Sequence, residues 1–272
     1  MTHPFDAPPP PRVPVWPEVG AAAPASTIVT QIASHRGGAQ VWPENSPTAF
    51  RNTAALPVQQ VEFDVHPTTD GRLAVIHDAT LERTTDGSGR VADRSWAELQ
   101  LLTLKGTDGE RIPALEDVLR LFRDTPITIR LELKADADRE RYPQLPAMVA
   151  DMLRQEHVLA KTIVTSFQAE YLVTLARTAM PQSLIWLVAN TVLADIGLEG
   201  VFAVAQRQGI PALSIHQTRL DATVVEQVRA ARLGIGGYAA HEDAVIRRMF
   251  ALGVDVFTTD RPDRAVAIRD AL

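Results

Sequence analysis

The sequence predicts an α/β fold, a (β/α)8 barrel, and three observations support that prediction. From about residue 27 onward, short β-rich runs alternate with stretches of helical period, which is typical of βα units. Eight such units can be counted, and a chain of 272 residues suits a barrel of that number. With 46% hydrophobic residues, the chain can also fill a sizeable core. We therefore expect one barrel domain over residues 27–272, preceded by a proline-rich arm over residues 1–26.

Nine runs have the composition of strands, one more than the barrel needs. They are Ile28–Ser34, Gln59–Val65, Arg72–His77, Ile127–Leu133, Thr162–Thr165, Leu184–Val188, Ala212–Ile215, Leu233–Gly236 and Val254–Thr258. The third run follows the second after only six residues, HPTTDG, whereas a parallel crossover needs about a dozen or more. Asp70–Gly71 is a tight-turn signal. We therefore expect the third run to fold back on the second as a hairpin.

The remaining eight runs are each followed by a helical pattern, for example at residues 47–56, 114–123, 145–157, 223–231 and 242–253. Residues 79–112 form a longer connection that is rich in Thr, Asp, Gly and Arg. This segment is too long for a plain loop, and an insertion after the second barrel strand lies on the catalytic face. We expect a small inserted cap subdomain here that helps to wall the site.

The composition excludes several classes of protein. A formal charge of −6 and a pI near 5.7 disfavour a nucleic acid or an anionic membrane as partner. Zero cysteines exclude disulfide scaffolds, cysteine zinc sites, iron–sulfur clusters and thiol nucleophiles. No apolar run approaches the roughly 18 residues of a spanning helix, and the first residues lack a signal-peptide pattern. We expect a cytoplasmic protein without a membrane anchor, and the oligomeric state is left open.

Two strands break the apolar pattern expected inside a barrel. In QQVEFDVH and ITIRLELK, polar residues alternate with apolar ones; the polar set is Gln60, Glu62, Asp64, His66, Thr128, Arg130, Glu132 and Lys134. Because side chains along a strand alternate between its two faces, each polar set shares one face. The apolar face must pack under the helices, so the polar face points into the barrel.

Three carboxylates of this set, Glu62, Asp64 and Glu132, lie near the carboxyl ends of adjacent strands, where barrel active sites form. Buried carboxylates are costly unless they are paired or bound to a cation. Hard oxygen donors without cysteine suit Mg²⁺ or Ca²⁺ better than Zn²⁺. The alternative is an internal salt-bridge lattice with Arg130 and Lys134.

Two histidines, His35 and His77, end strands at the same mouth as the carboxylates. Imidazole both donates and accepts protons near neutral pH, so such a pair across a metal suits acid–base hydrolysis. We expect the other five, His3, His66, His157, His216 and His241, to be structural or solvent-facing.

Basic residues at the same mouth can hold a phosphate. Arg36 precedes Gly37–Gly38, which would let the backbone approach a ligand closely, and Arg36 with Lys134 would hold phosphate oxygens. Glu44 is either an orienting partner for Arg36 or part of the helix start that follows it.

Seven motifs in fixed order resemble the glycerophosphodiester phosphodiesterase family. They are HRGG at 35–38, WPENSPTAF at 42–50, VEFDVHPTTDGRLAVIHDATLERTTDGSG at 61–89, IPALEDVL at 112–119, LELK at 131–134, SF at 166–167 and GVDVFTTDRP at 253–262. The resemblance spans about Ile32 to Pro262. It implies a barrel with the hairpin and insertion placed as above, and metal-dependent hydrolysis of a glycerophosphodiester to glycerol 3-phosphate and an alcohol.

The resemblance also implies roles for individual residues. His35 and His77 correspond to the family's two catalytic histidines, one as general base and one as general acid. Glu62, Asp64 and Glu132 correspond to the ligands of a divalent cation, Mg²⁺ or Ca²⁺. Arg36 and Lys134 correspond to the cations that contact the phosphate. The implied partner is a small-molecule glycerophosphodiester.

One segment departs from the family pattern. On the seventh barrel strand, Tyr238-Ala239-Ala240-His241 stands where the family usually has Trp-Thr-Val-Asn. The aromatic position is kept as a smaller ring with a hydroxyl, so we expect Tyr238 to contact the glycerol or alcohol side of the substrate. The change alters the shape and polarity of that side and removes no catalytic or metal-binding residue.

Two alternatives accompany this prediction. A lysophospholipase-D-like relative would use the same centre on lipids and would need an exposed apolar rim, which the acidic balance disfavours. A non-catalytic barrel that binds phosphodiesters should have lost His35, His77 or a carboxylate, and all of these are present.

Overall fold

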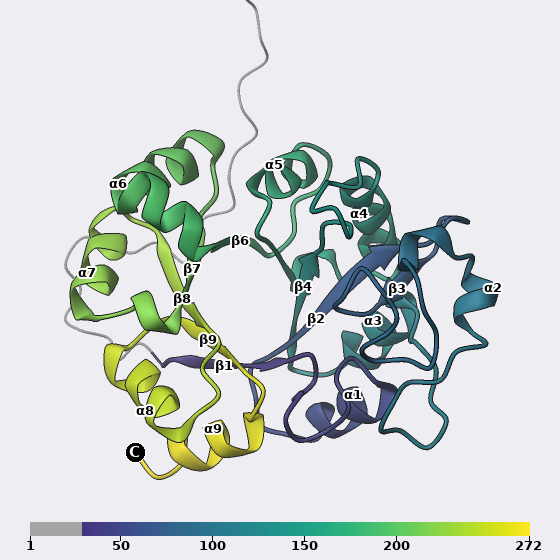
Figure 1. The fold of residues 1–272 in the computed structure, drawn as a ribbon. Coiled ribbons are helices and arrows are strands. Elements are labelled where there is room, and N and C mark those ends of the chain that lie inside the picture. Colours follow the sequence, from purple (N-terminus) through teal and green to yellow (C-terminus); the bar gives the residue numbers. More distant parts are fainter. Residues whose placement is uncertain (1–28) are drawn as a thin grey trace, which may run out of the picture.

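The computed structural model describes residues 29–272, and the proline-rich arm predicted over residues 1–26 lies outside them. Eight parallel strands form a closed barrel surrounded by helices, so the predicted (β/α)8 fold is confirmed (Figure 1). The strands are β1 (Gln31–His35), β2 (Gln60–Pro67), β3 (Leu73–Val75), β4 (Thr128–Leu133), β5 (Thr162–Ser166), β6 (Ser183–Val188), β7 (Ala212–His216), β8 (Gly234–Tyr238) and β9 (Val256–Thr259).

The barrel closes where β1 lies between β2 and β9, so the first and last strands are neighbours. The helices are α1 (Pro47–Ala54), α2 (Trp96–Leu99), α3 (Leu115–Arg123), α4 (Leu145–Gln155), α5 (Ala169–Thr178), α6 (Asn190–Gln208), α7 (Ala222–Ala230), α8 (Asp243–Leu252) and α9 (Pro262–Arg269). Three short 3₁₀ helices, η1 (Val91–Asp93), η2 (Leu159–Lys161) and η3 (Gln217–Arg219), complete the described part of the chain. The α-helices after the barrel strands pack on the outside, as the sequence predicts (Figure 1).

β3, the one strand outside the ring of eight, forms the predicted hairpin with β2. β3 pairs antiparallel with β2, with Val65 opposite Val75 and Pro67 opposite Leu73. At the turn the Thr68 amide donates to the Arg72 carbonyl, and Gly71 has a positive φ of 79° that favours glycine. The hairpin therefore lies outside the ring of eight strands and carries the chain to His77.

The alternation predicted for β2 and β4 sets the two faces of the barrel wall. Val61, Phe63 and Val65 are buried in the core between strands and helices. The parallel register places Glu62 beside Arg130 and Asp64 beside Glu132, so these polar side chains share the inner face. The sequence thus brings three carboxylates and a guanidinium together inside the barrel.

Residues 79–112 have an apolar cluster of their own. They contain η1 and α2, and Ser95 begins α2 with a capping box to Glu98. The buried cluster joins the end of the hairpin to this segment and consists of Ala74, Ile76, Leu81, Val91, Leu99, Leu104 and Ile112. The segment is therefore packed against the hairpin beside the mouth of the barrel.

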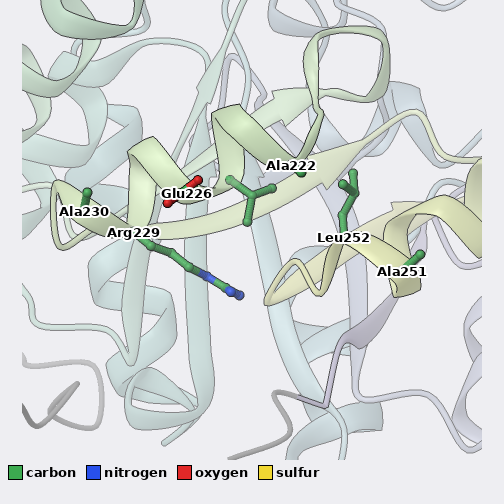
Figure 2. Close-up of a pocket in the computed structure, with 7 residues that line it drawn as sticks. Ala222, Glu226, Arg229, Ala230, Ala251 and Leu252 are labelled. Carbon is green, nitrogen blue, oxygen red and sulfur yellow. The ribbon is translucent and has the colours of Figure 1, made fainter. Parts of the chain in front are cut away.

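A groove lies on the outer shell between α7 and α8. Figure 2 shows this groove, which is lined by Ala222, Val225, Glu226, Arg229, Ala230, Ala251 and Leu252. None of the predicted site residues lies there.

None of the helices within residues 29–272 has the length and apolar character needed to cross a membrane.

Candidate active site

A pocket of about 330 Å³ lies where the barrel strands end. It is lined by His35, Arg36, Glu62, His77, Arg130, Glu132, Lys134, Thr165, Phe167, Leu187, His216, Tyr238, Ala239, His241 and Thr258. Seven of the nine predicted site residues are in this lining. The other two are in contact with it, because Asp64 belongs to the acidic cluster described next and Glu44 binds Arg36.

Glu62, Asp64 and Glu132 form one buried acidic cluster. Each residue offers a carboxylate oxygen, and these oxygens lie within 4.8 Å of one another. Burial and the neighbouring Asp64 raise the pKa of Glu62 to about 7, although His35 opposes this. Asp64 is buried too, but His77, Lys134 and Arg36 hold its pKa below the ordinary value. This arrangement of buried, mutually repelling carboxylates suits a divalent cation.

Only one of the two carboxylate oxygens of Asp64 accepts a hydrogen bond within residues 29–272. Asn45 Nδ2 donates to Asp64 Oδ2 at 3.0 Å, whereas Asp64 Oδ1 has no hydrogen-bond partner within residues 29–272. A buried carboxylate oxygen that is not hydrogen-bonded fits a metal ligand. Sequence reasoning missed Asn45, which lies in the WPENSPTAF motif and has a positive φ of 52° that asparagine tolerates.

His35 is held by a carboxylate that directly follows the last barrel strand. Its Nδ1 lies 2.5 Å from Asp260 Oδ1, while its Nε2 lies 3.9 Å from Glu62 Oε2 in the acidic cluster. Burial lowers the pKa of His35, but Glu62 and the hydrogen bond with Asp260 outweigh burial, and the pKa is raised above its ordinary value. Asp260 lies 225 residues from His35 in sequence, and sequence reasoning missed it.

His77 has an equivalent partner next to it in the sequence. Its Nδ1 lies 2.6 Å from Asp78 Oδ1, and its Nε2 lies 3.0 Å from Lys134 Nζ. The same ammonium donates to Glu132 Oε1 at 2.8 Å. Both predicted histidines thus bind a carboxylate through Nδ1 and turn Nε2 toward the acidic cluster or its partner Lys134.

The HRGG turn shapes the site through its backbone. The Arg36 amide donates to Glu62 Oε2 at 3.1 Å, and Arg36 has a positive φ of 51°. A Cβ on Gly37 would lie 2.9 Å from the Ala49 side chain, and one on Gly38 would lie 3.0 Å from the Trp42 ring. Packing against α1 and Trp42 therefore accounts for the two glycines, and a close approach of their backbone to a ligand stays a prediction.

Glu44 orients Arg36. Arg36 Nη1 donates to Glu44 Oε1 at 3.1 Å, and Arg83 of the inserted segment donates to both Glu44 oxygens at 2.7 and 2.8 Å. Ser46, and not Glu44, caps α1 through its hydroxyl. Burial raises the pKa of Glu44, but the bonds from Arg83 and Arg36 outweigh it and lower the pKa below the ordinary value. Of the two interpretations of Glu44, the structure supports the orienting partner.

The far wall of the pocket is aromatic. Tyr238 makes edge-on contacts with Phe167 and His216, with ring centroids 5.8 and 5.1 Å away. Its hydroxyl donates to the Val188 carbonyl at 3.1 Å, and burial raises its pKa to about 12. The pocket therefore has a charged side formed by β1, β2 and β4 and an aromatic side formed by β5, β7 and β8.

His241 lines the pocket, whereas the sequence predicts that it is structural or solvent-facing. Its Nδ1 accepts the Asp260 amide at 3.0 Å, and its ring lies 6.0 Å from that of His35. A ring nitrogen that accepts an amide hydrogen bond carries no proton, so a neutral His241 has its proton on Nε2. Burial lowers the pKa of His241 below its ordinary value, in keeping with the neutral form.

Of the predicted salt-bridge lattice, only part is present. Lys134 pairs with Glu132 and lies 3.5 Å from Asp64 Oδ1. Arg130 is fully buried, and none of its guanidinium nitrogens has a hydrogen-bond partner within the described residues. A lattice that uses both cations is therefore absent from residues 29–272.

Comparisons with known proteins identify the family of this chain. Residues 35–264 match the model of the glycerophosphoryl diester phosphodiesterase family. A glycerophosphodiester phosphodiesterase of Bacillus altitudinis is 31% identical over 252 residues, which cover 90% of this chain and 100% of that protein.

Solved structures give the same result. The crystal structure of an Agrobacterium tumefaciens protein proposed to be a glycerophosphoryl diester phosphodiesterase superimposes with a TM-score of 0.86 at 36% identity, covering 89% of this chain and 98% of that one. An Oleispira antarctica phosphodiesterase, solved in complex with the product sn-glycerol-3-phosphate, shares the fold at 23% identity and a TM-score of 0.76, covering 88% of this chain and 96% of that one. The chain belongs to the glycerophosphoryl diester phosphodiesterase family, and it is a phosphoric diester hydrolase.

Proposed function

We propose that this enzyme hydrolyses glycerophosphodiesters to glycerol 3-phosphate and an alcohol with the help of a divalent cation, Mg²⁺ or Ca²⁺. One observation carries the proposal. Two imidazoles, His35 and His77, each bind a carboxylate through Nδ1, and they flank a buried cluster of three carboxylates. The product complex of the Oleispira antarctica relative supports glycerol 3-phosphate as the product.

The cation would be held by Glu62, Asp64 and Glu132, whose oxygens are close together and include Asp64 Oδ1, which accepts no hydrogen bond within residues 29–272. When bound, it would polarise a phosphoryl oxygen as a Lewis acid. Asn45 fixes the other Asp64 oxygen, and the Arg36 amide fixes Glu62 Oε2. These contacts keep the carboxylates oriented before the cation arrives.

The phosphodiester carries a negative charge that repels nucleophiles, so the site must neutralise its oxygens. Arg36, oriented by Glu44, and Lys134, which lies between His77 and Glu132, supply positive charge on that side of the pocket. A guanidinium can bind two oxygens of one phosphate, and an ammonium acts as a point charge. Both residues position the phosphorus between the two imidazoles.

The two imidazoles carry the proton transfers. The bonds to Asp260 and Asp78 favour the tautomer in which Nδ1 bears the proton, so that Nε2, which at His77 also lies 3.0 Å from Lys134 Nζ, takes or returns a proton in the pocket. One histidine removes a proton from the attacking hydroxyl or water, and the other protonates the leaving alkoxide. Tyr238 and its aromatic neighbours face the organic part of the substrate.

The test is a panel of glycerophosphodiesters, with and without MgCl₂ or CaCl₂, scored by released glycerol 3-phosphate. H35A and H77A should each lower turnover by ~100-fold or more. H157N is the matched control, because His157 is exposed and asparagine tolerates its positive φ of 57°. EDTA should abolish turnover reversibly.

Two results would contradict the proposal: full turnover in the H35A/H77A double variant, or unchanged turnover after thorough chelation. A lysophospholipid arm in the same panel separates the lipid-specific alternative, which predicts faster turnover of the lysophospholipid than of glycerophosphocholine.

A further inference from the structure

A cation inside the barrel is not used by the proposed mechanism. Arg130 lies in the middle of β4, is fully buried, and has no exposed guanidinium atom. Its Nε, Nη1 and Nη2 make no hydrogen bond to any group within residues 29–272, and unlike Lys134 it forms no ion pair there. A buried charge without a direct partner is costly, so a fold that keeps one invites a functional explanation.

The strand register places this cation beside the acidic cluster. Glu62 is the register partner of Arg130 on β2, and Glu132 follows two residues later on the same face of β4. Both carboxylates stabilise the charged guanidinium electrostatically. A guanidinium is not deprotonated in proteins at neutral pH, so Arg130 is charged there. Arg130 is therefore a permanent positive charge next to two of the three proposed metal ligands.

Within residues 29–272, Glu62 and Glu132 are the carboxylates whose charge acts on Arg130. The inner wall contains a buried apolar cluster of Ala33, Ile163, Ile185, Ala212 and Val256. The inward-facing hydroxyls of Thr165 and Ser214 are neutral, and they have no hydrogen-bond partner within the described residues either. Electrostatic interactions are screened weakly in such an interior, so the field of Arg130 reaches the carboxylates.

Direct contact with substrate does not explain this residue. All three guanidinium nitrogens are sealed from solvent, whereas Arg36 and Lys134 remain partly exposed at the mouth. Arg130 can therefore act on the reaction only through Glu62 and Glu132.

We propose that Arg130 is a built-in counter-charge of the metal centre: it holds Glu62 and Glu132 in place when no cation is bound, and it weakens the binding of a divalent cation. This inference rests on the metal site of the proposed function. Arg130 is a positioning residue, since it affects the cation by repulsion and the carboxylates by attraction, and touches neither substrate nor reacting atoms. Its consequence is a centre that binds and releases its ion readily.

The test is isothermal titration of the purified full-length enzyme, stripped of metal, with MgCl₂ and separately with CaCl₂. R130M removes the charge and keeps a long side chain, so it should bind the cation tenfold more tightly or more, equal to about 1.4 kcal/mol. R130K keeps the charge and should stay within threefold of the parent. R94M is the matched control for loss of one positive charge, because the Arg94 side chain is 43% exposed and lies 3.7 Å from Glu98, its other contact being a hydrogen bond to the Ser88 carbonyl.

A second readout does not depend on titration heats. Tighter binding by R130M should widen the difference in melting temperature between the enzyme in excess Mg²⁺ and the same enzyme in EDTA. If R130M does not fold, R130Q provides the same removal of charge with polar atoms retained. A merely structural role would lower both melting temperatures and leave the affinity unchanged or weaker.

Unchanged or weaker binding by the neutral variants overturns the inference, and so does equally tightened binding by R130K. If the parent enzyme hydrolyses glycerophosphodiesters and binds a cation that R130M leaves unaffected, this inference fails alone. If the parent enzyme binds neither Mg²⁺ nor Ca²⁺, the metal centre of the proposed function fails together with it.

Discussion

Replacing Asp260 with asparagine is the sharpest test of the His35 environment. The substitution removes the charge that lies 2.5 Å from His35 Nδ1 and leaves the size of the side chain unchanged. Two unit charges about 4 Å apart interact by roughly 4 kcal/mol at an effective dielectric constant of about 20. His35 and Asp260 are 21% and 16% exposed, so we expect about half of that value to be realised, near 2 kcal/mol.

Loss of an interaction of about 2 kcal/mol should lower the pKa of His35 relative to the parent. NMR of the imidazole in the metal-free enzyme measures this change directly. Turnover of glycerophosphocholine at saturating cation should fall by ~100-fold, because the imidazole becomes a weaker base and is less firmly oriented. Affinity for the cation should change little, since Asp260 is outside the acidic cluster.

D270N is the matched control, because Asp270 is exposed after α9 and pairs with the neighbouring Arg269. If D260N leaves the His35 pKa unchanged and keeps turnover close to that of D270N, the role assigned to Asp260 is refuted.

Three further outcomes are expected. E132Q should weaken Mg²⁺ binding by roughly 100-fold in a titration, because it removes one of three buried carboxylate ligands; unchanged affinity would exclude it as a ligand. H241A should raise KM for glycerophosphodiesters by ~10-fold with a smaller change in kcat, and H241N should restore KM; an equal loss in both variants would exclude a hydrogen-bond donor role. Burial raises the pKa of Asp255, and the hydrogen bond from the Ile235 amide and the charge of Arg229 oppose this shift. Ionisation of Asp255 therefore costs stability as the pH rises above the ordinary carboxyl pKa. D255N should gain stability relative to the parent between about pH 4 and pH 7 in urea unfolding, and a relative loss would contradict this.

Periodicity predicted the part of the site that lies within single strands. The alternation along β2 and β4 was enough to place Glu62, Asp64 and Glu132 on one inner face, because side chains of a strand necessarily alternate. The short connection from Val65 to Arg72 was enough to predict the hairpin, because it cannot span a parallel crossover.

Contacts between distant strands were not predicted. Asp260 meets His35 only because the barrel closes between β1 and β9, and no local pattern encodes that pairing. The position of His241 in the pocket was not predicted either, because its ring is held by the backbone amide of Asp260, and a backbone contact leaves no pattern in the sequence. The hydrogen bond from Asn45 to Asp64 was not predicted, because Asn45 carries no charge and its partner is 19 residues away in the sequence. Sequence alone therefore predicted the groups that gather in the pocket and one group that orients them, Glu44, but not Asn45 and Asp260, which bind Asp64 and His35.

The junction of β1 and β9 has a consequence for biosynthesis. His35 ends the first barrel strand and Asp260 directly follows the last one, so 225 residues separate the two members of this pair in the sequence. A nascent or truncated chain that stops before β9 can contain every carboxylate of the acidic cluster and still lack the partner of His35. The carboxylate that orients His35 is therefore added only together with the last strand of the barrel.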